Sequence, residues 1–144
     1  MKSRILLSLG ILSIVVTSFH WVIAQQAPSV WDGVFTEEQA RRGEVAYGES
    51  CSECHGASLA GIDMAPGLAQ GDFIWNYDGM PVATLFQRIR DTMPLGNAGA
   101  VRRSEKVDIL AFVMEKNTFP AGSEELPSRN SILSGITWLA VNPN

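Results

Sequence analysis

The sequence contains few residues that could bind a metal ion. Its 144 residues include only two cysteines, Cys51 and Cys54, and two histidines, His20 and His55. If the two cysteines act together, none is left for a disulfide, and two thiolates cannot hold a four-sulfur cluster. A structural zinc site needs four nitrogen or sulfur ligands, whereas Cys51, Cys54 and His55 supply three. His20 lies in the apolar N-terminal segment.

That N-terminal segment, residues 1–24, predicts a secretory signal peptide. It has a basic start with Lys2 and Arg4, an apolar middle, and Val22-Ile23-Ala24 at the −3 to −1 positions of a signal-peptidase site. We expect cleavage after Ala24. An uncleaved membrane anchor is the alternative, although the serines, the threonine and His20 weaken it as a bilayer span. No later run of the sequence is apolar enough to cross a membrane.

Positive charge is also scarce. Removal of the signal peptide leaves residues 25–144, which by length form one domain, with its core at about residues 36–127. Nine basic residues then stand against 15 acidic ones, a net charge of −6. This sign disfavours nucleic-acid binding and favours a protein partner with a basic docking face.

The most informative motif is Cys51-Ser52-Glu53-Cys54-His55. The pattern C-x-x-C-H is typical of the covalent attachment of a c-type haem. Cys51 and Cys54 would form thioethers with the haem vinyl groups, and His55 would supply the proximal imidazole to the iron. A redox-active dithiol is the alternative, but it should follow a strand in a βαβ setting. The segment before Cys51 instead predicts a helix.

Three helices are predicted around this motif. The first begins at Thr36, which with Gln39 forms a capping box, and runs to about Tyr47 or Gly48. The second begins at Pro81 and ends before Met93-Pro94. The third covers about Ser104 to Asn117 and carries a broad apolar stripe. Residues 56–79 predict an irregular segment suited to wrapping a flat macrocycle, and the tail from Ser123 should pack onto the domain.

A low-spin electron-transfer haem needs a second axial ligand, and a methionine thioether is the usual partner of histidine. The expected mature chain offers Met64, Met80, Met93 and Met114. We favour Met93, which follows a helix in a loop fixed by Pro94, with Met80 as the runner-up. Met114 fits better as core filler.

Further residues are candidates for the surroundings of the haem. His55 Nδ1 should donate to a carbonyl, and that of Pro66 is a good candidate because the proline nitrogen carries no competing N–H. Buried haem propionates need donors, for which Tyr77, Trp75 and Arg90 are candidates. The simpler interpretation is that Tyr77 and Trp75 are packed aromatic rings and that Arg90 is a solvated side chain.

Together these residues resemble the class I c-type cytochromes, over roughly residues 36–127. More narrowly, the chain is similar to the small monohaem cytochromes associated with pyrroloquinoline-quinone-dependent dehydrogenases. The similarity is carried by residues 36–43, 51–56, 85–94, 108–112, 119–122 and 125–127. It implies an all-α fold with three main helices around one covalently attached haem c, the first and last helices crossing at Gly43, Tyr47 and Phe112. Two departures are Ala65, where glycine is usual, and Arg102-Arg103, where a helix-capping Ser or Thr is usual.

The resemblance implies a periplasmic one-electron carrier rather than an enzyme. His55 and Met93 would close both axial positions of the iron. The donor would be a periplasmic quinoprotein dehydrogenase, and the acceptor an oxidase or another cytochrome. We expect a monomer or a subunit of a dehydrogenase complex. The alternatives are a haem-based sensor or small-ligand binder with a labile sixth site, and a dedicated cytochrome subunit. No Ser/His or carboxylate constellation indicates catalysis.

Overall fold

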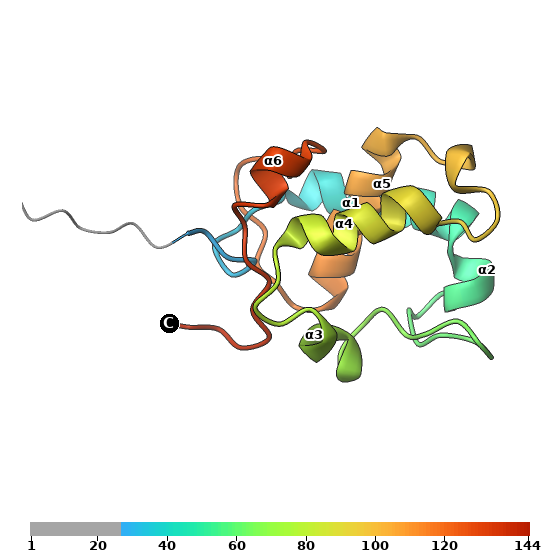
Figure 1. The fold of residues 1–144 in the computed structure, drawn as a ribbon, viewed down its shortest axis with the longest axis horizontal. Coiled ribbons are helices and arrows are strands. Elements are labelled where there is room, and N and C mark those ends of the chain that lie inside the picture. Colours follow the sequence, from blue (N-terminus) through green and yellow to red (C-terminus); the bar gives the residue numbers. More distant parts are fainter. Residues whose placement is uncertain (1–26) are drawn as a thin grey trace, which may run out of the picture.

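The structure, a computed structural model, describes residues 27–144, and the expected signal peptide lies outside the described residues. Within this range it is helical and has no strand, only isolated β-bridges. The predicted all-α class is therefore confirmed. Its elements are α1 (Glu37–Ser50), α2 (Ser52–His55), α3 (Asp72–Asn76), α4 (Val82–Thr92), the 3-10 turn η1 (Ala98–Ala100), α5 (Arg103–Lys116) and α6 (Asn130–Leu133). Figure 1 shows their arrangement. None of the described helices is both long and apolar enough for a bilayer span.

Helices α1 and α5 cross at Gly43. A Cβ atom placed on Gly43 would lie 1.9 Å from the carbonyl oxygen of Asp108, so only glycine allows the two backbones to come this close. One turn further on, the rings of Tyr47 and Phe112 pack with their centroids 5.2 Å apart. Arg42 Nε donates to the Asp108 carboxylate at 3.1 Å beside the crossing.

Only one of the two hydrogen bonds of the predicted capping box forms at the start of α1. The Thr36 hydroxyl accepts the backbone N–H of Gln39 at 3.1 Å. The Gln39 side chain does not reach back to Thr36, which corrects the prediction. It is buried, and its amide donates to the Leu126 carbonyl at 2.9 Å and accepts the Leu126 N–H at 2.7 Å. Gln39 therefore fixes the segment after α5 against α1.

Helix α5 is the centre of the core. It begins at Arg103 rather than at the predicted Ser104, because the Glu105 carboxylate accepts the backbone N–H of Arg102 at 2.9 Å and so satisfies the first free donor. From Ile109 to Met114 every residue is buried. Met114 is fully buried, as expected of core filler.

The C-terminal tail packs onto the domain as predicted, and it also fixes α3 and the start of α4. The fully buried Trp138 donates its indole N–H to the Ile74 carbonyl at 3.0 Å. Its backbone N–H donates to Met80 at 2.8 Å, and its carbonyl accepts from Gly79 at 2.8 Å. Its ring packs edge-on against Phe73. The tail thus holds the connection that carries Tyr77 and Met80.

Candidate functional site

One large cavity opens between α2, the segment after it, α3 and α4. Its volume is about 1220 Å³, and its lining is mostly apolar. Pockets for small molecules usually measure roughly 300–1,000 Å³, so this space is large enough for a macrocycle. Figure 1 shows α2 and the C-terminal end of α4 at the same end of the molecule, and residues from both line the cavity.

The Cys51–His55 motif forms a single helical turn in the wall of this cavity. The His55 N–H donates to the Cys51 carbonyl at 2.9 Å, so both sulfurs and the imidazole project from the same short turn. Cys51, Cys54 and His55 all line the cavity. The element directly before the turn is helix α1 and not a strand, unlike the setting of a redox-active dithiol. Burial raises the pKa of the Cys51 thiol, whereas reactive dithiols depend on a lowered pKa.

The imidazole of His55 is oriented by the loop that follows α2. Its Nδ1 lies 2.8 Å from the carbonyl oxygen of Pro66, which can only accept a hydrogen bond. Nδ1 therefore donates the hydrogen bond, and in the neutral imidazole Nε2 then presents a lone pair. A metal-ligating histidine needs this arrangement. The loop is folded back by Gly61, whose φ is +81° and whose N–H donates to the His55 carbonyl at 2.8 Å.

Tyr47, for which the sequence predicted only a packing role, anchors the end of α2. Its hydroxyl donates to the Gly56 carbonyl at 2.7 Å. Burial raises the pKa of Tyr47 to about 12, so the hydroxyl remains a neutral donor at physiological pH. An aromatic residue one turn before the motif is the signal that pointed to this position.

Three methionines line the cavity and one does not. Met93 is half-buried at the residue where α4 ends, and its N–H donates to Ile89 at 3.2 Å. Met64 and Met80 also line the cavity, but the exposed fraction of Met64 is 96%. Met114 lies in the core instead. Met93, the favoured residue, and Met80, the runner-up, therefore both remain candidates for the second axial ligand.

Of the three residues predicted as propionate donors, only Tyr77 lines the cavity. Tyr77 lines the cavity, half-buried, and burial raises its pKa. Trp75 is outside the lining and is 60% exposed. Arg90 is also outside it, and its guanidinium donates to the Asp91 carboxylate at 2.6 and 2.9 Å.

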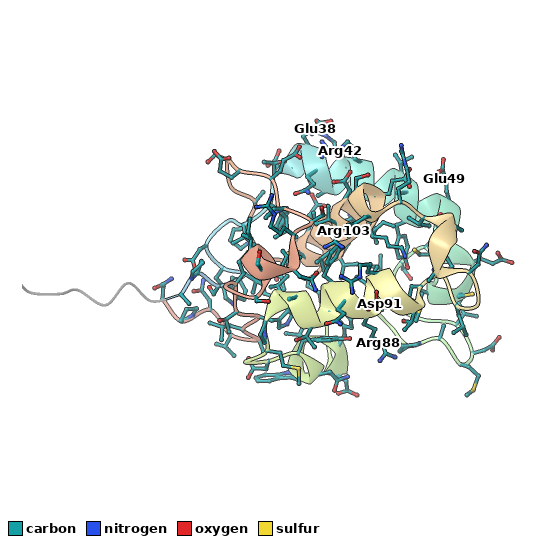
Figure 2. All side chains as sticks on the ribbon, turned by 45° about the horizontal axis from the view of Figure 1, so that its top comes forward. Glu38, Arg42, Glu49, Arg88, Asp91 and Arg103 are labelled. Atoms are coloured by element: carbon teal, nitrogen blue, oxygen red, sulfur yellow. The ribbon has the colours of Figure 1, made fainter. Side chains whose placement is uncertain are left out.

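Arg88 lines the cavity. The sequence had instead indicated Arg90 as the arginine at this site. Residues two apart on a helix point in nearly opposite directions at 3.6 residues per turn. Arg88 follows the cavity-lining Leu85 by three positions, and this spacing was the signal that could have found it. Figure 2 shows the Arg88 side chain projecting from α4. Arg88 is the only lysine or arginine among the lining residues of the described chain.

Across residues 27–144, no three His, Cys, Asp or Glu side chains gather in a group that could hold a metal ion. No family model, curated protein or solved structure matches this chain.

Proposed function

We propose that this chain is a monohaem class I c-type cytochrome that carries one electron at a time. The observation that supports this most strongly is the position of the Cys51–His55 turn. It lies in the wall of a cavity of about 1220 Å³, with the His55 ring oriented by a carbonyl. Cys51 and Cys54 would hold one haem c covalently, and His55 and Met93 would be its axial ligands.

The residues present fit such a group. The apolar lining suits a macrocycle, and the donor set of two thiols, one imidazole and one thioether suits a covalently held, six-coordinate iron. When bound, the haem would supply a one-electron couple between ferrous and ferric iron.

The residues that line the cavity would bind the haem, orient its histidine ligand and exclude water. Pro66 would hold the His55 ring so that Nε2 is free to bind the iron, and Met93 would supply the second protein ligand. Tyr77 and Arg88 would offer an O–H and a cation to the propionates. The apolar part of the lining would limit the access of water, which together with the ligands would set the reduction potential.

The partner proposal rests on charge and on the resemblance. A net charge of −6 for residues 25–144 suits a redox partner with a basic docking face. By the resemblance, the donor is a periplasmic quinoprotein dehydrogenase, and the acceptor is an oxidase or another cytochrome. Such encounters are brief and bury less than about 1,200 Å².

The test is expression in a host with cytochrome assembly machinery, followed by intact-mass measurement and an optical redox titration. We expect the mass of one covalently added haem, a low-spin spectrum and a ferric iron–sulfur charge-transfer band. Replacement of both Cys51 and Cys54 by Ala should abolish covalent haem. Export without any added tetrapyrrole would contradict the proposal.

A further inference from the structure

The C-terminal end of α4, next to Met93, has a carbonyl group without a backbone donor. The last carbonyls of a helix need partners from outside its regular hydrogen bonds. The N–H of Met93 bonds to Ile89 at 3.2 Å, and the chain becomes extended at Met93. The next residue, Pro94, would be the regular partner of the Arg90 carbonyl, but proline has no N–H.

Lys106 of α5 supplies the missing donor. Its Nζ lies 2.8 Å from the carbonyl oxygen of Arg90 and 2.6 Å from that of Ala98. These two residues flank the segment that carries Met93 and Pro94. One ammonium group therefore joins both ends of this segment to the central helix of the core.

Lys106 is the only buried charged side chain within residues 27–144, with 3% of its surface exposed. Burial lowers the pKa of Lys106, and the charge of Asp91 partly opposes this effect. No carboxylate lies within salt-bridge distance of Lys106 in the described chain. A buried ammonium group is costly unless acceptors surround it, and an apolar residue would suit this core position better on packing alone.

We propose that Lys106 is the positioning residue for Met93, keeping the thioether at the iron by tying the two ends of its loop to α5. This inference rests on the proposed function. Without Lys106 the partly buried carbonyls of Arg90 and Ala98 would lose this donor, the loop would open, and an external ligand would displace Met93 more readily.

The experiment compares the haem-loaded protein with Lys106→Met, with imidazole as the probe that competes for the ferric iron. Each hydrogen bond to a charged group stabilises by roughly a factor of ten or more in an equilibrium constant. We expect imidazole to bind Lys106→Met about tenfold or more tightly than wild type, and the iron–sulfur charge-transfer band to weaken. Far-ultraviolet circular dichroism checks that the helices remain.

Lys116→Met is the matched control, because Lys116 lies on the same helix with its side chain 40% exposed. It removes the same charge and should leave the imidazole affinity unchanged. Lys106→Arg keeps the charge and the donors, and it should restore part of the wild-type behaviour. A general loss of stability would not produce this pattern in fully folded protein.

The outcomes separate the two proposals. A wild type without the iron–sulfur band would overturn the proposed ligation itself. A wild type with the band, and a Lys106→Met variant with the same band and imidazole affinity, would overturn only the role of Lys106. If Lys106→Met does not fold, Lys106→Gln is measured instead. Tighter imidazole binding by this variant supports the inference, and unchanged binding refutes it.

Discussion

Replacement of Gly43 by alanine should destabilise the domain by separating α1 from α5. The added Cβ would lie 1.9 Å from the Asp108 carbonyl oxygen, whereas such contacts are essentially never below 3.0 Å. The helices must therefore move apart by about 1 Å, against the Tyr47–Phe112 packing and the Arg42–Asp108 hydrogen bond. Overpacking of this kind costs roughly 1–3 kcal/mol or more, and alanine recovers up to about 1 kcal/mol of helix propensity.

The net loss for Gly43→Ala is then roughly 1–2 kcal/mol, which lowers Tm by roughly 4–8 °C in a domain of this size. Gly48→Ala is the matched control on the same helix, because a Cβ there meets nothing within 4 Å. It should instead raise stability by about 1 kcal/mol. Thermal and urea unfolding of both haem-loaded variants, followed by circular dichroism, gives the comparison. A Gly43→Ala protein as stable as wild type would refute the crossing geometry.

Three further predictions concern the site. Met93→Ala should make the haem high-spin or water-ligated and lower its reduction potential markedly; a low-spin spectrum with an unchanged potential would refute Met93 as the ligand. Arg88→Gln should lower the potential measured by optical titration, because a cation beside the cavity favours the reduced iron, whereas Arg90→Gln should change it less; equal shifts would contradict the placement of Arg88. Because the pKa of Tyr47 is raised to about 12, from about 10 in the unfolded chain, its contribution to stability is complete below pH 10 and is lost as the pH rises toward 12. Tyr47→Phe should flatten the fall in urea stability between pH 9 and 12, and an unchanged slope would show that Tyr47 does not contribute.

The helix ends that depend on neighbouring residues were predictable from the sequence. Thr36 caps α1, and α4 ends before Met93-Pro94, because capping and proline effects act within one turn. Pro81 was expected as the first helical residue and instead precedes it as the cap. The short helix α3 was missed, since five residues within a glycine-rich segment carry too little periodicity to detect.

The parts of the site that depend on distant contacts were not predictable. Gln39 fits a local capping pattern, yet its amide is used 87 residues away at Leu126. Arg88 and Arg90 look equivalent in sequence, and the choice between them depends on which face of α4 meets the cavity. Lys106 was not selected from the sequence, because a charged residue beside an apolar stripe is what a solvated helix face would also show.

The same physical problem explains why these residues are needed. A cavity wide enough for a macrocycle has walls of irregular backbone, whose carbonyls lack the regular partners that helices provide. In this chain, polar side chains anchored in the core supply donors to carbonyls in the wall or in the loops and helix ends beside it: Tyr47 to Gly56, Asn117 to Leu68, Trp138 to Ile74 and Lys106 to Arg90. Each donor is buried and holds one segment in or next to the wall against a rigid helix or the tail. A polar side chain inside an apolar core segment is therefore a sequence signal for a loop that needs support, and in this fold that loop lies next to a candidate ligand or its cavity.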